Sequence, residues 1–366
     1  MDKKSASELR ATGEDAYFVA SNSARGFQSY YDECFNNREI GRVFVIKGGP
    51  GTGKSRFMRE VSDCAVQHGW QRRMIYCSSD ANSLDGVILC KGARSIALLD
   101  GTAPHVFEPK IPGVREDLVN LGEFWNGDRL QSRGSEIEEC HRAKLMGYRM
   151  TYRYLSAYGA IYENRAEKLA PYVRWKPLSD YAKRLMDSID DGISFESQTA
   201  LMESVGMSGR VRFDTYAARA RQLYLIADCR GIGGYLLREL YRLAMEKRLR
   251  VRVSRDPILP DVIDGLFLTE SGVAFVVGDE ETCRYPHHLI SMRRFLRVSE
   301  MQSIRKSVNF DRQLMDAMLG EALEQMQQVR RAHFELEQIY SEAMDFEAKE
   351  NFTKKFCIRL FDLQNL

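Results

Sequence analysis

The sequence predicts an α/β protein made of two tandem halves, and three observations support this fold class. Short apolar runs alternate with helical segments, which is typical of parallel sheets flanked by helices. A glycine-rich stretch follows an apolar run twice, about half the chain apart. Two long segments repeat apolar residues in steps of three and four, which predicts a long helical hairpin extension in each half.

Length also favours two domains. At 366 residues the chain is too long for one ordinary hydrophobic core. We therefore expect a first domain over 1–190 and a second over 191–366. Their helical extensions are expected at about 115–190 and about 300–366.

Composition argues against several classes of protein. A net charge of +2 does not indicate a nucleic-acid binder or a membrane-surface protein. No apolar run approaches the roughly 20 residues that span a bilayer, and the charged amino terminus does not resemble a secretory signal. The eight cysteines form no CxxC pair, so we expect neither a zinc site nor a disulfide framework, and a cytoplasmic location.

The first glycine-rich stretch has the spacing of a phosphate-binding loop. Val43–Ile46 predicts a buried strand before it, and Arg56 to about His68 predicts a helix after it. Between them the sequence matches G-x-x-x-x-G-K-[ST], the Walker A pattern of P-loop NTPases. The nucleotide-binding residues that it predicts are Gly48, Gly49, Pro50, Gly51, Thr52, Gly53, Lys54 and Ser55.

The pattern has a physical reason. Glycines let the backbone wrap around a phosphate so that N–H groups point at its oxygens, and the helix N-terminus adds partial positive charge. Lys54 is expected to reach the β- and γ-phosphates, and the Ser55 hydroxyl to ligate Mg²⁺. The alternative is a glycine-rich turn that carries a surface lysine.

Two aspartates follow predicted strands. Ile96–Leu99 leads to Asp100, which we expect to be the Walker B carboxylate that helps to hold Mg²⁺; the alternative is an aspartate that caps the next turn. Met74–Cys77 predicts another strand, and Asp80 follows it. Because ligands of parallel sheets bind beyond the carboxyl ends of the strands, the catalytic residues we predict are Lys54, Asp100 and Asp80.

Absent motifs narrow the kind of nucleotide. The sequence has no N-K-x-D for guanine and no LSGGQ, so ATP is favoured over GTP and an ABC-type ATPase is disfavoured. Gly101 rather than glutamate follows Asp100, so the water-activating base of many motor ATPases is missing there. Asp80, Asp85 or Glu108 would have to orient water, or hydrolysis is slow.

The second glycine-rich stretch indicates an internal duplication. A shift of about 180 places Phe44–Ile46 on Tyr224–Ile226, and Asp85–Leu89 matches Asp264–Leu268. The second copy has lost the chemical groups of the first: Lys54 becomes Gly234, Ser55 becomes Tyr235, Asp100 becomes Val277 and Gly48 becomes Asp228. We expect this copy not to bind Mg-ATP, because an added carboxylate opposes a triphosphate.

The same comparison helps to interpret other segments. Asp85 persists as Asp264, which favours a structural role for both. The helical stripes are interpreted as packing surfaces; their members include His141, Leu145, Tyr148, Met326, His333 and Tyr340. The segments that carry the stripes are interpreted as a lid or as arms that report nucleotide state. The basic run Lys247–Arg255 is interpreted as a strand with a solvated face or as a strand at a sheet edge. The alternative is that its arginines bind an anionic partner or reach over the first site; Arg230 is another candidate for an arginine that reaches the first site.

The chain resembles a bacterial family of tandem P-loop ATPases. The resemblance rests on KGGPGTGKS (Lys47–Ser55), CSSDANSLDG (Cys77–Gly86) and LDGTAPHVFEP (Leu99–Pro109), each half ending in a long helical region. It implies two P-loop NTPase-like domains and an ATPase activity. This chain departs from the family in its second loop, where the relatives can carry a recognisable P-loop.

These observations together predict an ATP-binding protein, a Mg²⁺-dependent ATPase (a hydrolase) with one competent site and a second copy that regulates or scaffolds it. One alternative is a P-loop kinase of small molecules or nucleotides, in which the helical segment is a lid. Another is a non-hydrolysing nucleotide sensor with a protein partner that binds the helical arms. We expect no nucleic-acid partner and no membrane association.

Overall fold

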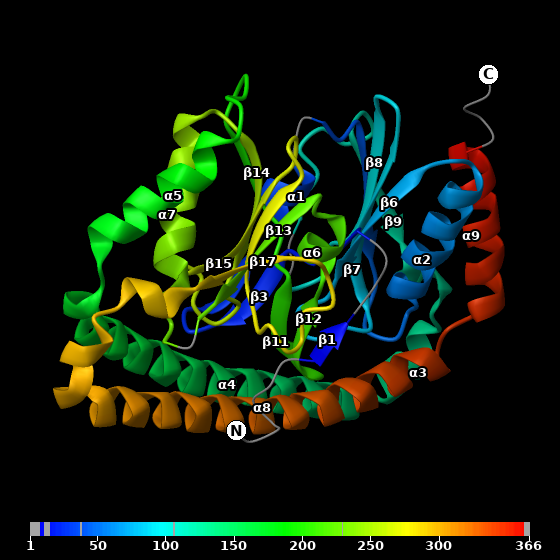
Figure 1. The fold of residues 1–366 in the computed structure, drawn as a ribbon. Helices are drawn as coiled ribbons and strands as arrows, with labels where there is room; N and C mark the ends of the chain where they lie inside the picture. Colours follow the sequence, from blue (N-terminus) through cyan, green and yellow to red (C-terminus); the bar gives the residue numbers. More distant parts are fainter. Residues whose placement is uncertain (1–7, 11–14, 37–38, 105–106, 229, 362–366) are drawn as a thin grey trace.

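Two six-stranded sheets, each covered by helices, make up most of the protein (Figure 1). The structure is a computed structural model that describes residues 8–10, 15–36, 39–104, 107–228 and 230–361. Within those ranges it is an α/β protein with mixed sheets of mostly parallel strands. We call each sheet with its covering helices the first body and the second body.

The sheet of the first body is formed by the first part of the chain. Its strands are, in spatial order, β2 (Asp15–Phe18), β6 (Gln71–Tyr76), β7 (Leu84–Lys91), β8 (Arg94–Asp100), β5 (Arg42–Lys47) and β9 (Glu116–Asn120). All neighbours are parallel except β7, which runs antiparallel to β6 and β8. The expectation of parallel sheets therefore holds for most of the strands but not for β7. A two-residue turn containing Gly92, with φ 60°, folds β8 directly back on β7.

The sheet of the second body repeats this arrangement. Its order is β10 (Glu196–Thr199), β14 (Arg250–Arg255), β15 (Ile263–Leu268), β16 (Val273–Val277), β13 (Gln222–Ala227) and β17 (His288–Ser291), with β15 as the antiparallel strand. The pairing registers also correspond. Ile46 lies opposite Asp100 in the first sheet, and Ile226 lies opposite Val277 in the second. The strand pairing thus matches the shifts found in the sequence.

The inner faces of the two sheets share one apolar core, which includes Leu99 of the first sheet and Val276 of the second. Helices α1 (Tyr31–Phe35) and α6 (Thr215–Arg219) contribute to it. Short strands also lie near this boundary: β1 (Glu8–Arg10), β3 (Ala20–Ser23), β4 (Gly26–Ser29), β11 (Glu203–Gly206) and β12 (Gly209–Phe213).

The outer faces are covered by helices, and here the two halves of the chain exchange elements. Helices α2 (Lys54–Gln67) and α9 (Phe346–Phe361) pack on the first sheet, where Phe356 contacts Phe44 and Phe57. Helices α7 (Gly233–Glu246) and α5 (Trp175–Asp187) pack on the second. The final helix of each half therefore covers the sheet of the other half (Figure 1).

Two long antiparallel helices connect the bodies and run side by side beneath both sheets (Figure 1). They are α4 (Gly134–Leu169), which follows α3 (Gly127–Ser132), and α8 (Arg305–Glu342). Gly147 permits their close approach, since a Cβ atom there would lie 2.6 Å from a Val329 methyl carbon. The 3₁₀ turns at their ends are η1 (Leu121–Phe124), η2 (Ala170–Tyr172), η3 (Met292–Phe295) and η4 (Val298–Ser303).

This arrangement differs from the expected hairpin within each half, because the long helix of one half pairs with that of the other. The predicted apolar stripe is buried along α8, at Met326 and Leu336 among others. On α4 the stripe is buried at Leu155 and Leu169, but Leu145 is 70% exposed. Within the described ranges, none of the helices is both long and apolar enough to cross a membrane.

Candidate functional site

The loop Gly48–Ser55 connects the end of β5 to the start of α2, as the Walker A pattern predicts. We call it the first loop. Gly51 and Gly53 have φ values of 72° and 79°, a conformation that glycine adopts without strain. Helix α2 begins at Lys54, so its N-terminal N–H groups point toward the loop. This local structure supplies a positively polarised backbone at the carboxyl edge of the first sheet.

The Lys54 side chain lies in this loop beside an acidic partner. Its ammonium donates to the carbonyl oxygens of Gly48 at 3.0 Å and Gly49 at 2.8 Å. The same nitrogen lies 3.6 Å from Oδ2 of Asp100, which ends the neighbouring strand β8. Both side chains are largely buried, so their attraction is weakly screened. The structure thus brings together two of the three predicted catalytic residues.

Asp100 has a second set of contacts. Its Oδ1 accepts a hydrogen bond from the Thr102 N–H at 2.9 Å and another from the Thr102 hydroxyl. Burial raises the pKa of Asp100, and the charge of Lys54 partly opposes this shift. The two interpretations of Asp100 therefore do not exclude each other, since one oxygen caps the following turn and the other faces Lys54.

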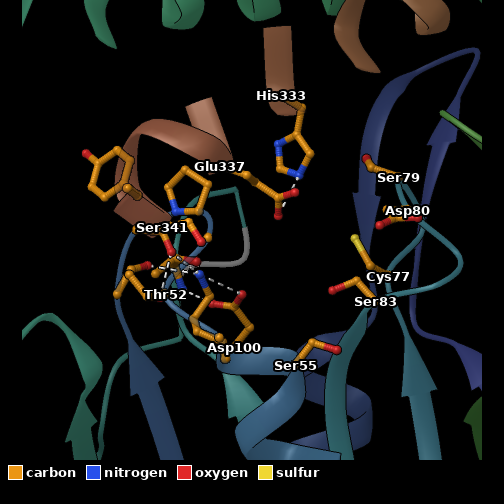
Figure 2. A pocket seen from close by; sticks show the side chains of 18 of the residues that line it. Thr52, Ser55, Cys77, Ser79, Asp80, Ser83, Asp100, His333, Glu337 and Ser341 are labelled. Atoms are coloured by element: carbon orange, nitrogen blue, oxygen red, sulfur yellow. Dashed lines mark hydrogen bonds and ion pairs between the residues drawn. The ribbon is translucent and has the colours of Figure 1, made fainter. Parts of the chain in front are cut away.

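The residues expected to hold Mg²⁺ carry the type of donor atom that this ion prefers. Ser55 and Asp100 both lie at the floor of the pocket in Figure 2 and offer oxygen donors, which Mg²⁺ prefers. The Ser55 hydroxyl accepts the Leu84 N–H at 2.9 Å and keeps a second lone pair. In the described ranges no cluster of three His, Cys, Asp or Glu side chains forms a metal site. An Mg²⁺ ion held mainly by phosphate and water oxygens needs no such cluster.

The three acids considered as water-orienting residues lie in different surroundings. Asp80 lines the pocket, but its Oδ1 accepts from the backbone and side-chain nitrogens of Asn82 and so closes a turn. Asp85 lines the pocket from β7 and is buried. Glu108 is 73% exposed, pairs with Lys47 and is not among the residues that line the pocket.

The long helices form the roof of the pocket, a cavity of about 1060 Å³. A Cβ atom at Gly51 would lie 2.3 Å from the carbonyl oxygen of Glu337, so α8 contacts the first loop directly. The roof residues from α4 and α8 are His141, Lys144, Tyr148, His333, Glu337, Gln338, Tyr340, Ser341 and Glu342. None of them was predicted as a site residue from the sequence, although His141, Tyr148, His333 and Tyr340 lie on the predicted stripes.

Three of the roof side chains form a hydrogen-bonded chain. Lys144 Nζ lies 3.2 Å from His333 Nδ1, and His333 Nε2 lies 3.4 Å from Glu337 Oε1. An ammonium group only donates, so Nδ1 must accept and Nε2 carries the proton that faces Glu337. The chain fixes the His333 tautomer and aims the Glu337 carboxylate.

The second loop, Asp228–Tyr235, occupies the equivalent place between β13 and α7. The Asp228 carboxylate accepts the backbone N–H groups of Arg230 at 3.2 Å, Gly231 at 2.9 Å, Ile232 at 3.0 Å and Gly233 at 2.5 Å. Three of these donors, Gly231, Ile232 and Gly233, correspond to residues of the first loop whose N–H groups would surround a phosphate, whereas Arg230 corresponds to Pro50, which has no N–H. The Asp228 carboxylate therefore occupies the place at which the loop would bind a phosphate, in addition to repelling a phosphate by its charge.

Arginines lie near the second loop or between the bodies. Arg165 of α4 is buried close to Gly231, and the charge of Asp228 partly opposes the lowering of its pKa by burial. Arg252 pairs with Asp15 of the first body at 3.3 Å. The strand that carries Arg252, β14, lies between β10 and β15 in the second sheet. The edge-strand interpretation is therefore wrong. None of Arg230, Arg250 and Arg252 lines the first pocket in the described part of the chain.

Comparisons with known protein families, with curated proteins and with solved structures find no match to this chain.

Proposed function

We propose that the protein binds ATP at the first loop and hydrolyses it in a Mg²⁺-dependent reaction. The observation that carries the proposal is the convergence of Lys54, the glycine loop and Asp100 in one cavity of about 1060 Å³. This volume accommodates a nucleotide and its phosphates. The chain would then be a P-loop NTPase of the tandem kind that its motifs resemble.

The chain's own groups would stabilise the charge of the transferring phosphoryl group. The N-terminus of α2 lies at the first loop, and its N–H groups, with those of the loop, would donate to phosphate oxygens. Lys54 would exchange its contacts with the carbonyl oxygens of Gly48 and Gly49 for the β- and γ-phosphates. When bound, Mg²⁺ would neutralise phosphate charge, with Ser55 and Asp100 as its protein contacts.

The second body would scaffold and complete this site. Its loop is filled by Asp228, and Val277 offers no metal ligand where the first body has Asp100. The second half of the chain nevertheless contributes α8 and α9, which cover the first loop and α2. In this interpretation the degenerate copy kept its structure because the competent site depends on it.

A kinase is the second candidate, and the extent of the cavity favours it. Beyond the first loop the pocket continues to Asp80, Tyr148 and Met207, which leaves room for an acceptor molecule. Asp80 or Asp85 would then orient an acceptor hydroxyl. The third candidate, a nucleotide sensor, draws on the contact between Gly51 and α8, through which bound nucleotide would move the helical arms toward a protein partner.

Release of inorganic phosphate from ATP, with and without candidate acceptors, tests the proposal. Wild-type protein with Mg²⁺ should release phosphate without an acceptor, and Lys54→Ala should lose this activity by 100-fold or more, as on removal of a main charge-stabilising group (about 3 kcal/mol). Formation of ADP only when an acceptor is present would favour the kinase. Equal phosphate release by wild type and Lys54→Ala would contradict the site assignment.

A further inference from the structure

Helix α8 brings a carboxylate from the second half of the chain to the first loop. The Glu337 carbonyl oxygen lies against Gly51, and the Glu337 side chain points down into the pocket in Figure 2. It faces the space between Asp100 on one side and Ser79 and Asp80 on the other. This is the space beyond the first loop in which a terminal phosphate would lie.

The surroundings of Glu337 keep it ionised and oriented. Burial disfavours its charged form, yet its pKa lies below the usual value, because the contact with His333 and the charges of Lys54 and Lys144 outweigh burial. The hydrogen-bonded chain from Lys144 through His333 occupies Oε1. A carboxylate has about four acceptor positions, so Glu337 can still accept a proton from a bound water.

Asp100 and Asp80, the two acids predicted from the sequence as catalytic residues, are less suited to activate water. Asp100 has one oxygen occupied by Thr102 and the other facing Lys54. Asp80 closes the turn with Asn82. Asp256 closes a similar turn with Ile258 and Leu259 in the second body, which has no competent loop, and this marks such an aspartate as structural.

We propose that Glu337 is the catalytic residue that orients the attacking water and accepts its proton, and that His333 is a positioning residue for it. The proposal rests on the proposed ATP hydrolysis at the first loop. It assigns to the second half of the chain a chemical role in the reaction of the first.

The step balances without another reactant. The water oxygen forms a bond to the γ-phosphorus, and the bond from that phosphorus to the bridging oxygen breaks. ADP leaves with the bonding electrons, and the water proton passes to Glu337, which later releases it to solvent. Inorganic phosphate and ADP are the products.

The test measures ATP binding and turnover separately for Glu337→Gln, with Mg²⁺ present. This isosteric change removes the base but retains hydrogen bonding, so kcat should fall about 100- to 1000-fold while the Kd for ATP stays within about threefold. Glu324→Gln, an exposed change on the same helix, is the matched control and should leave both unchanged. His333→Ala should lower kcat about tenfold with little change in Kd, and His333→Gln, which keeps a donor, should recover part of this loss.

The outcomes separate this proposal from the one on which it rests. If wild type binds and hydrolyses ATP but Glu337→Gln turns over within about threefold of it, the role of Glu337 is refuted and ATP hydrolysis stands. Loss of ATP binding in Glu337→Gln would also refute it, because the residue would then be structural. If wild type itself neither binds nor hydrolyses ATP, the proposed function fails.

Discussion

Replacing Asp228 by glycine should weaken the second body and open an anion site in it. The wild-type carboxylate accepts four backbone N–H groups at 2.5–3.2 Å at the start of α7. Glycine is the residue of the first loop at this position, so the change restores the shape of an empty phosphate nest. The substitution therefore tests whether Asp228 serves as an internal anion.

The expected magnitude follows from these contacts. One hydrogen bond to a charged group contributes about 1.5–3 kcal/mol, but four bonds to one carboxylate are not additive, and water can reach the half-buried loop. For comparison, loss of an N-cap aspartate costs about 0.5–2 kcal/mol; Asp228 bonds the same end of α7 from four residues before its N-cap, Ile232. Arg165, whose Nε has no hydrogen-bond partner among the described residues, would also lose a compensating charge. We expect a total loss of about 2–4 kcal/mol.

Hydrogen exchange measured by mass spectrometry resolves this loss in peptides from β13 and α7. The experiment uses a Lys54→Ala background, which should weaken any anion binding at the first loop. Asp228→Asn is the control that keeps the shape of the side chain. Inorganic phosphate at 100 times its Kd should raise the free energy of unfolding of Asp228→Gly by about 2.7 kcal/mol. This increase is measured relative to chloride at equal ionic strength. Equal exchange in Asp228→Gly and its parent, or equal protection of both by phosphate, would refute the reasoning.

Two further predictions concern stability. Phe356→Ala should lower the free energy of unfolding of the first body in urea by about 3–5 kcal/mol, because this buried ring contacts Phe44 and Phe57 across the exchanged helices. The control is Ile358→Ala, which should have little effect because Ile358 is 59% exposed. A loss of stability confined to the second body would contradict the exchange of helices. Burial raises the pKa of Asp264 to about 6 from 3.8, so its contribution to stability is full below pH 4 and is lost as the pH rises through 6. Asp264→Asn, which cannot ionise, should therefore gain up to about 3 kcal/mol relative to wild type between pH 4 and 7, and a difference that does not vary with pH would contradict this.

The loop and its strands could be predicted because their signals are local. Glycine spacing, an apolar run and a following helix lie within about 25 residues, and Asp100 ends a strand that apolar pattern alone identifies. Strand direction was missed at β7 because an apolar run does not reveal its orientation. The short turn at Gly92 was the available signal.

The roof of the site could not be predicted, for a different reason. An apolar stripe shows that a helix packs, but not on which partner, so the pairing of α4 with α8 and the exchange of α5 and α9 were not accessible. His333 was included in a packing stripe, and Glu337, one turn later, gave no signal of its own. The carboxylate of Asp228 was expected to repel phosphate, whereas the structure shows that it accepts the backbone N–H groups of its own loop.

The most direct test of the central claim is the stoichiometry of ATP binding to the wild-type chain, measured by isothermal titration calorimetry with Mg²⁺. We predict one ATP per chain, since Lys54, Ser55 and Asp100 serve the first loop and Asp228 fills the second. Binding of two ATP molecules per chain would contradict the loss of the second site. Absence of binding would contradict the nucleotide site at the first loop.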